Sequence, residues 1–487
     1  MDTEHTQTNR WLVLVIACLA QFMVVVDSTV VNVALPSIQR GLGFSSGNLQ
    51  WVVDAYTLMF GGFLLLGGRA ADLLGRRRLF IAGVGLFAVA SLLNGLALSP
   101  VMLTLGRGLQ GLGGALVAPA ALSIIMTTFQ DAGERTRALG VSSAITAGGA
   151  AIGLLLGGLL TDLVSWRWIF FINLPVGVAA VLLGLQFVPE SRADLGHRRF
   201  DLAGAAVVTG GLLAVVFGIV KAQAWGWGSP RTLAVLGAGA LLLALFLVIE
   251  SRSAAPLVKL SIFRVRAIAV ANTAMLLVAS GMFGMFFFVS LYAQEILHYS
   301  PLTAGVAFLP LSVGIVIGAG LAQAMVGRLG IRNVSIIGLA LATGGFALMT
   351  RVPVHGHYVS ALLSAFMPMS VGLGLVFVPI TLLATSGVSS DDAGLASGLF
   401  NSAQQVGGSL GLAVLSTLAI DHTTGLLRGS AVVAAATRAA ATVSGYHVAF
   451  VAAVLMMGAA ALLLGLLLRK HHVQPAVTNQ PAFGAAA

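Results

Sequence analysis

Charged residues are scarce in this chain. Asp, Glu, Lys and Arg together make up 9% of its 487 residues, whereas water-soluble globular proteins carry about 25%. Hydrophobic residues make up 58%, and the mean hydropathy is +0.99. This composition excludes a soluble globular protein and predicts a polytopic membrane protein, because roughly 20 apolar residues form one membrane-spanning helix.

Cysteine and lysine are almost absent as well. Cys18 is the only cysteine, which excludes a disulfide framework and a cysteine-rich metal site. The chain has no G-x-x-x-x-G-K-[ST] motif, and its only lysines are Lys221, Lys259 and Lys470, so it cannot hydrolyse ATP through a P-loop. The histidines show no metal-binding spacing within an apolar run. We therefore expect no enzyme, no metal site and no cofactor, so that any transport is driven by an ion gradient such as the proton gradient.

Long apolar runs dominate the rest of the chain. Continuous runs argue against a membrane β-barrel, whose strands alternate apolar and polar residues. The run that begins at Trp11 is too long for a signal peptide and lacks a cleavage site, so we expect a retained first helix. The sequence thus predicts an all-α polytopic membrane protein with fourteen transmembrane helices near residues 11–35, 50–68, 79–98, 101–128, 138–163, 168–188, 202–221, 232–250, 267–293, 303–326, 333–350, 358–385, 393–420 and 446–468.

The distribution of basic residues predicts the orientation. With a cytoplasmic N-terminus, about 18 of the 26 Lys and Arg residues fall on cytoplasmic segments, as the positive-inside rule requires. The net charge of +10 is then a topology signal, and no nucleic-acid partner is expected. We expect a multi-pass protein of the cytoplasmic membrane, surrounded by lipid, monomeric, with both termini cytoplasmic. The richness in Ala and Gly and the preference for Arg over Lys indicate a bacterium with GC-rich DNA.

Three short patterns recur at nearly one separation. Ser143-Ala144-x-x-x-Gly148-Gly149 and Gly68-Arg69 both recur 259 positions later, and Gly114 with Pro119 recurs 260 positions later. Such parallel repeats are typical of transporters, although chance matches in an Ala/Gly/Leu-rich sequence are the alternative. The repeats predict an N-terminal six-helix bundle over 1–190, two additional helices with linkers over 191–257, a C-terminal six-helix bundle over 258–470 and a cytoplasmic tail over 471–487.

Several motifs carry a family resemblance across about residues 11–470. The segment GRAADLLGRRR at 68–78 resembles the signature loop of the major facilitator superfamily. The segments DSTVVNVALP at 27–36, RGLQG at 107–111, WRWIFFINLP at 166–175 and SPLTAG at 300–305 resemble those of its fourteen-helix drug:proton antiporters. The resemblance implies the major facilitator fold and proton-driven efflux. One departure bears on the direction of transport: Gly153 is followed by Leu154, where the antiporter pattern carries Gly-Pro.

Two glycine-containing segments are candidates for conformational change. In the loop expected between the second and third spans, Gly68 permits close backbone approach, and Asp72 can cap a helix or pair with Arg76 or Arg78. Such a charge lock can break when two halves rock apart; basic residues that only fix topology are the alternative. We assign the conformational switch to Gly68, Asp72, Gly75, Arg76 and Arg78.

The second segment is a glycine stripe in the fifth span. Gly149, Gly153 and Gly157 recur every four residues, with Gly158 adjacent, and such stripes let helices pack backbone to backbone. The resemblance implies an antiporter helix at the interface of the halves, with plain tight packing as the alternative.

Charge inside the membrane is costly, at about 2.5 to 3.5 kcal/mol for a central Asp or Arg, and so indicates function. Asp27, Asp54 and Arg107 all fall in the outer half of their spans. If these spans are neighbours, as the superfamily fold implies, Arg107 can neutralise one carboxylate and leave the other free to carry a proton. We therefore predict that Arg107 lies within reach of Asp27 or Asp54 and that the three residues couple transport to protons. A static ion pair, and simple exposure of Asp54, are the alternatives.

Polar and soft apolar residues at similar depth suggest a substrate cavity. Adaptable apolar surface with a few polar groups suits bulky amphipathic or cationic ligands, although such residues also face lipid or neighbouring helices. The expected lining consists of Gln21, Asn32, Gln110, Met282, Phe283, Phe286, Phe287, Asn401, Gln404 and Gln405.

These features together predict proton-driven efflux of hydrophobic, cationic or amphipathic small molecules such as antibiotics or dyes. The alternatives are a dedicated exporter of one metabolite or self-made antibiotic, a proton-coupled uptake permease, and a nontransporting receptor.

Overall fold

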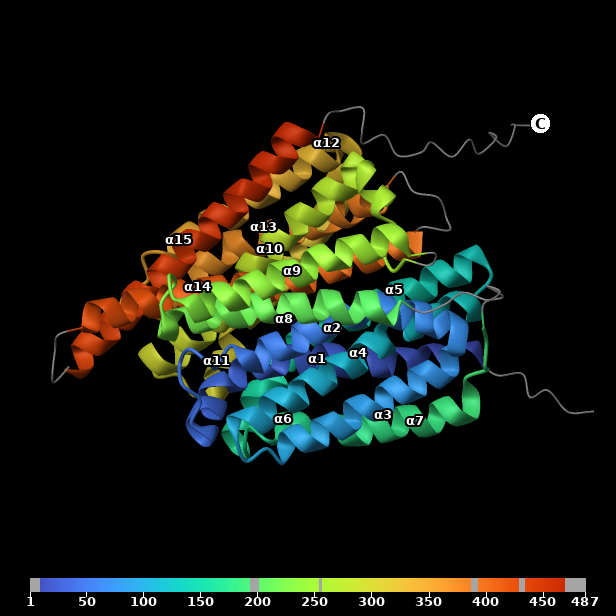
Figure 1. Cartoon of the computed structure of the whole chain (residues 1–487), viewed down its shortest axis with the longest axis horizontal. Helices are drawn as coiled ribbons and strands as arrows, with labels where there is room; N and C mark the ends of the chain where they lie inside the picture. Colours follow the sequence, from blue (N-terminus) through green and yellow to red (C-terminus); the bar gives the residue numbers. More distant parts are fainter. Residues whose placement is uncertain (1–8, 193–200, 254–255, 387–392, 429–433, 469–487) are drawn as a thin grey trace, which may run out of the picture.

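The computed structural model describes residues 9–192, 201–253, 256–386, 393–428 and 434–468 (Figure 1). The expected tail over 471–487 lies outside the described residues. Within them the chain is helical, without a β-strand. Its α-helices are α1 (Arg10–Leu42), α2 (Trp51–Leu74), α3 (Arg76–Gly95), α4 (Pro100–Thr128), α5 (Ala132–Leu163), α6 (Trp168–Phe171), α7 (Asn173–Phe187), α8 (Leu202–Trp225), α9 (Pro230–Arg252), α10 (Arg266–Leu291), α11 (Pro301–Ala307), α12 (Leu309–Met349), α13 (Ser364–Ala384), α14 (Ala393–Leu427) and α15 (Ala435–Leu467).

Thirteen helical stretches among the described residues are long and apolar enough to cross a membrane. The longest, Pro301–Met349, has 49 residues and would extend about 74 Å at 1.5 Å per residue. That is more than twice the roughly 30 Å of a bilayer's hydrocarbon core. Gly330, with φ 77° and ψ 158°, kinks this stretch between the two predicted spans 303–326 and 333–350. The stretch is therefore long enough for two crossings, as the expected fourteen spans require.

The signature segment is helical, although the sequence led us to expect a loop over it. Helix α2 continues to Leu74, and α3 begins at Arg76, so that the connection is Gly75 alone. Gly75 adopts φ 113°, a conformation that glycine reaches at no steric cost. The charged side chains in the segment misled the prediction, because they lie at the helix ends, where they do not interrupt the helix.

The helices form two groups, and α8 packs between them and α9 (Figure 1). One apolar core lies within α1–α7, and a larger one extends through α10–α15 and reaches the outer parts of α1 and α2. Helix α8 packs against α9, α2 and α14, so it contacts both groups. We call α1–α7 the N-terminal group and α10–α15 the C-terminal group.

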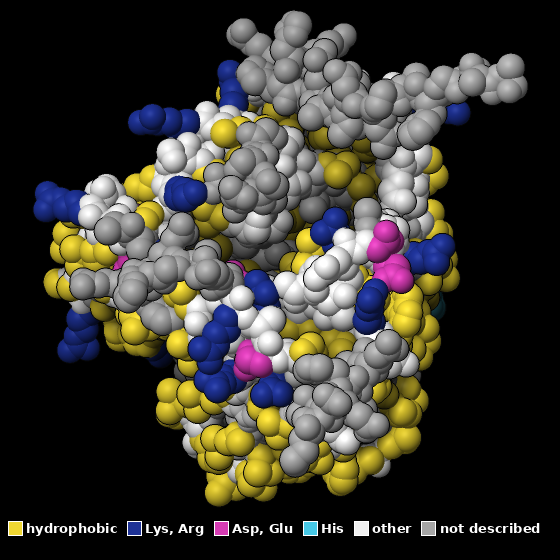
Figure 2. Space-filling model, turned by 90° about the vertical axis from the view of Figure 1, so that its right-hand side faces the viewer, with side chains coloured by type: hydrophobic (Ala, Val, Ile, Leu, Met, Phe, Trp, Pro, Cys, Tyr) yellow, Lys and Arg dark blue, Asp and Glu magenta, His cyan; other side chains and the backbone are white. Residues whose placement is uncertain are grey.

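The two groups meet at the ends predicted to face outward. The Ser290 hydroxyl donates to the Asn32 carbonyl at 2.6 Å, and the Gln294 amide donates to the Val33 carbonyl at 2.7 Å. Helix α11 packs against α5 at this same end. Figure 2 shows the opposite end of the molecule, where Lys and Arg side chains gather. The outer end is therefore closed by direct contacts between the groups.

Candidate functional site

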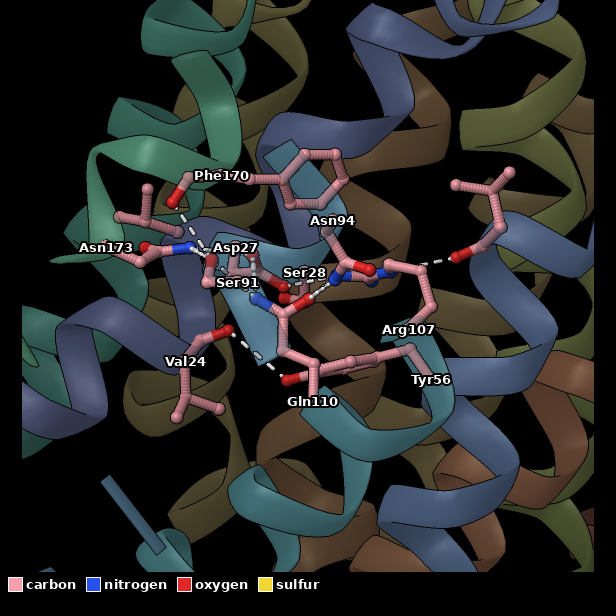
Figure 3. Close-up of polar contacts among 12 residues, drawn as sticks. Val24, Asp27, Ser28, Tyr56, Ser91, Asn94, Arg107, Gln110, Phe170 and Asn173 are labelled. Atoms are coloured by element: carbon pink, nitrogen blue, oxygen red, sulfur yellow. Dashed lines mark hydrogen bonds and ion pairs between the residues drawn. The ribbon is translucent and has the colours of Figure 1, made fainter. Parts of the chain in front are cut away.

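Asp27 is the centre of a buried polar cluster in the N-terminal group (Figure 3). Its side chain is fully buried in α1. Arg107 Nη1 lies 2.5 Å from Asp27 Oδ2, and the amides of Gln110 and Asn173 donate to Oδ1 at 2.6 and 2.8 Å. Both carboxylate oxygens therefore have donors, and a cation balances the charge. Such full pairing is what keeps an ion pair tolerable in a low-dielectric interior.

Arg107 is fixed by α2 as well as by Asp27. Its Nε donates to the Val52 carbonyl at 2.9 Å, and its Nη1 also donates to Gln110 Oε1 at 2.7 Å. The guanidinium lies over the Tyr56 ring, 4.3 Å from the ring centre. Cation–π contact of this kind stabilises a desolvated arginine. The prediction that Arg107 lies within reach of Asp27 or Asp54 is confirmed for Asp27.

A second layer of polar side chains orients the first. Ser91 accepts from Gln110 and Asn173 at 3.1 and 2.9 Å and donates to the Phe170 carbonyl at 2.9 Å. Asn94 donates to Gln110 Oε1 at 2.8 Å. Gln110, which we expected to line the cavity, is instead fully buried in this cluster. Ser91, Asn94 and Asn173 received no role from the sequence, although a polar residue in an apolar run was the available signal.

Asp54 lies apart from this cluster and faces the C-terminal group. It is fully buried, so that simple exposure is the wrong interpretation for this residue. Its Oδ1 accepts from the Ser409 hydroxyl of α14 at 2.8 Å, and its Oδ2 has no hydrogen-bond partner among the described residues. Among the residues that the structure describes, no ion pair includes Asp54. The expected three-charge group is therefore an Asp27–Arg107 pair and a separate carboxylate.

The switch residues form local ion pairs at the end shown in Figure 2. Asp72, in α2, accepts from Arg76, the first residue of α3, at 2.9 Å, which is one of the two expected pairings. Arg78 lies 3.6 Å from Glu190, which also lies 3.8 Å from Arg77. Glu190 was missed because it lies more than a hundred residues away in the sequence, beyond the end of α7.

The glycines of this segment have unequal surroundings. A Cβ on Gly75 would lie 2.5 Å from Glu190 Oε1 and would displace that carboxylate, and φ 113° is strained for any residue with a side chain. A Cβ on Gly68 would lie 3.5 Å from Pro119, which is ordinary contact. The close backbone approach that we expected at Gly68 belongs to Gly67, which faces the Ala115 carbonyl.

The glycine stripe of α5 packs mainly on α1. A Cβ on Gly149 would lie 3.1 Å from Phe22, one on Gly153 would lie 3.0 Å from the Val26 carbonyl, and one on Gly157 would lie 2.6 Å from the Val30 carbonyl. Gly158 instead faces the C-terminal group, where a Cβ would lie 2.6 Å from the Pro301 carbonyl. The stripe thus joins helices within one group, and Gly158 provides the close approach between groups.

The polar residues expected to line a cavity differ in their surroundings. Gln21 accepts from Ser142 of α5 at 2.6 Å, and Asn32 donates to carbonyls of its own helix. Asn401 is exposed and donates to the Ser397 carbonyl at 3.0 Å. Gln404 and Gln405 are half-buried in α14.

The aromatic and sulfur side chains of α10 divide in a similar way. Met282 and Phe287 are buried in the core of the C-terminal group. Phe283 and Phe286 are half-buried, and the Phe286 ring centre lies 5.8 Å from that of Phe308. Within the described residues, no three His, Cys, Asp or Glu side chains are grouped as metal ligands.

Comparison with known proteins gives the family. The sequence profile of the Major Facilitator Superfamily matches residues 17–412. The puromycin resistance protein pur8 of Streptomyces alboniger is 44% identical over 444 residues, which cover 91% of this chain and 88% of that protein. The cephamycin export protein CmcT of Amycolatopsis lactamdurans is 39% identical over 426 residues, which cover 87% of each protein.

A solved structure shares the fold. The inward-facing, unoccupied form of a bacterial homologue of the human lysosomal transporter Spinster superposes with a TM-score of 0.66 at 16% identity, covering 95% of this chain and 97% of that one. The helical architecture, the buried charges in the membrane-spanning helices and the match over most of the sequence agree: this chain belongs to the major facilitator superfamily.

Proposed function

We propose that this protein exports hydrophobic, cationic or amphipathic small molecules, such as antibiotics, across the bacterial cytoplasmic membrane in exchange for protons. The observation that carries the proposal is the pair of different carboxylate environments in adjacent helices. Asp27 is matched by Arg107 and two amides, whereas Asp54 has one neutral donor and no cation. These surroundings favour the ionised form of Asp27 and the protonated form of Asp54. Two acids with different protonation states allow a protein to bind a proton and release it.

The relatives support efflux as the direction. One is named for resistance to puromycin and another for export of cephamycin. Export carries a compound out of the cytoplasm, and removal of an antibiotic from the cytoplasm is one route to resistance. No ATP-binding loop is present in the sequence, so the proton gradient is the energy source in this proposal and no cofactor takes part.

The arrangement of the groups supports alternating access. The N-terminal and C-terminal groups make direct contacts at the outer end and along α2 and α14, and basic side chains gather at the opposite end (Figure 2). By the positive-inside rule, this basic end faces the cytoplasm in the proposed orientation. In this proposal the groups, six spans each, rock about the substrate while the signature segment and Gly158 provide the contacts that form and break.

Export of a single antibiotic is the second candidate function. It is favoured by the two relatives named above, since the name of each refers to one compound. Transport assays with puromycin, a cephamycin and a cationic dye separate the candidates, because a dedicated exporter moves one of the three and a multidrug exporter moves several.

Inverted membrane vesicles provide the test of antiport. A preset inward-acidic proton gradient is followed with a pH-sensitive dye while puromycin or a cationic dye is added outside. Antiport predicts that the added compound dissipates the gradient, and that vesicles containing Asp54→Asn protein at equal abundance do not respond. An unchanged gradient accompanied by substrate uptake contradicts the proposal.

A further inference from the structure

The hydrogen bond between Asp54 and Ser409 joins the two groups of helices. The two residues are 355 positions apart in the sequence, and both side chains are fully buried. The Ser409 hydroxyl, from α14, donates to Asp54 Oδ1, in α2, at 2.8 Å. The contact between these helices continues toward the other end, where the Ser402 hydroxyl donates to the Gly61 carbonyl at 3.0 Å. We call the α2–α14 contact lined by these four residues the seam.

Helix α8 covers the seam with apolar side chains. Leu58 of α2 and Ala413 of α14 share one apolar cluster with Leu212, Val216 and Val220 of α8. Leu58, Val216 and Ala413 have no exposed surface. The additional helix therefore separates this part of the seam from the surroundings, and Asp54 lies beside apolar surface.

The charged and titratable groups on the helices around Asp54 are engaged elsewhere. Arg107 of α4 pairs with Asp27 of α1 and stacks on Tyr56. Lys221 of α8 donates to Asn48 at 3.3 Å, and Asp421, near the outer end of α14, accepts from Trp227 at 3.2 Å. Helix α3 carries its charges, Arg76–Arg78, at the opposite end of the bundle. Ser409 is thus the group that contacts the Asp54 carboxylate through a hydrogen bond in the described structure.

This environment suits a neutral acid better than a carboxylate. A carboxylate removed from water needs a cation or several donors, and a buried polar atom without a partner is costly. Asp54 has one neutral donor, and its Oδ2 has none. Ionised Asp54 would gain solvation if the seam opened and water reached it, whereas the neutral acid loses little by staying closed.

We propose that Ser409 is a positioning residue that links the protonation of Asp54 to closure of the seam. Proton uptake by Asp54 permits α14 to close on α2, and the Ser409 hydroxyl holds the neutral acid in the closed arrangement. Loss of the proton opens the seam. This inference rests on the proposed function, because it assigns the step by which a transported proton moves the two groups.

The distance across the outer end of the seam provides the test. Cys18 is the only native cysteine, so Cys18→Ala removes it, and Ser46→Cys with Leu426→Cys then places two spin labels at exposed positions beside α2 and α14. Pulsed electron paramagnetic resonance in liposomes measures the label distance from pH 5 to pH 9. The proposal predicts a short distance at low pH and a longer one at high pH. With Asp54→Asn, the distance is expected to stay short at every pH.

Ser409→Ala and Ser402→Ala form a matched pair of variants. Both remove a seam hydroxyl, but only Ser409 contacts the carboxylate. One hydrogen bond is worth about three- to tenfold in an equilibrium, so Ser409→Ala should move the midpoint of closure to lower pH by roughly half a unit to one unit. Ser402→Ala should leave the midpoint in place, and Ser409→Thr should restore it.

The outcomes separate this inference from the proposed function. A distance that does not change with pH in the otherwise unmodified protein, or equal midpoints for Ser409→Ala and Ser402→Ala, overturns the role of Ser409. Those results do not contradict antiport if substrate still dissipates a proton gradient in vesicles. Failure of that vesicle assay, with a pH-dependent distance still present, overturns the proposed function instead.

Discussion

Arg107 and Asp27 form an ion pair with almost no exposed surface, with Nη1 2.5 Å from Oδ2 and relative exposures of 1% and 0%. Arg107 also donates to the backbone of α2, so the pair connects three helices of the N-terminal group. The remaining carboxylate, Asp54, is thereby left without a cation and faces the C-terminal group. The two acids therefore differ because Arg107 contacts Asp27 and does not contact Asp54.

Asp27→Asn should abolish proton-coupled transport without preventing membrane insertion. The amide cannot titrate, and Arg107 loses its counter-charge. Removal of one partner of a buried pair costs about 3 to 5 kcal/mol, so the unfolding temperature should also fall. Transport in vesicles and thermal unfolding of the purified protein measure the two effects.

The double variant Asp27→Asn/Arg107→Gln is the control for that prediction. It removes both charges, so it should recover much of the lost thermal stability while remaining inactive. Full gradient-driven efflux by Asp27→Asn would contradict the assignment of Asp27 to proton coupling.

Gly75→Ala should destabilise the junction of α2 and α3. The added Cβ would meet the Glu190 carboxylate, and φ 113° is strained for alanine. The expected loss is about 1 to 3 kcal/mol of stability, with slower transport. Gly85→Ala is the matched control, because a Cβ there has open space around it and the residue lies within α3. Equal thermal unfolding of the two variants would show that the junction tolerates a side chain.

Asp72→Asn should slow turnover while leaving the apparent substrate affinity nearly unchanged. Asp72 contacts Arg76 and is partly exposed, so the pair contributes at most about 1 kcal/mol to stability. Its expected effect is on the balance between conformations. Initial rates over a range of substrate concentrations distinguish a lower maximal rate from a higher KM, and weakened binding at an unchanged maximal rate would argue against a switch.

Gly158→Ala should hinder closure at the outer end. A Cβ would lie 2.6 Å from the Pro301 carbonyl, and backbone cannot move aside as a flexible side chain can. Overpacking of this kind costs about 1 to 3 kcal/mol, which corresponds to roughly a 5- to 150-fold loss in the closed population. Gly148→Ala, on the same helix with open space, is the control. Transport rates and labelling of an outer-end cysteine by a membrane-impermeant reagent measure the effect, which should be absent in the control.

The fold was largely predictable because its signals are local. Long apolar runs determine membrane helices, and the repeats at 259 positions place the equivalent elements: Pro119 lies inside α4, and its counterpart Pro379 lies inside α13. The Asp27–Arg107 contact was predictable as well. Each charge alone is costly in the membrane, and two opposite charges at the same depth can pair.

The other contacts of the site depend on which face of each helix packs against which neighbouring helix. The sequence of a mostly apolar helix does not indicate which face that is. Gln110 and Phe287 have suitable chemistry for a cavity, yet both are buried among neighbouring helices. Ser409 and Glu190 gain their importance from partners far away in the sequence. Neither residue stands out from spacing alone.

Simultaneous measurement of substrate and proton flux tests the central claim most directly. Purified protein in liposomes is given a pH gradient and radiolabelled puromycin, and both fluxes are followed with no membrane potential. The account predicts opposite fluxes in a fixed ratio, and loss of both gradient-driven fluxes with Asp54→Asn. Substrate movement without proton flux, or with protons moving in the same direction, would contradict proton-coupled export.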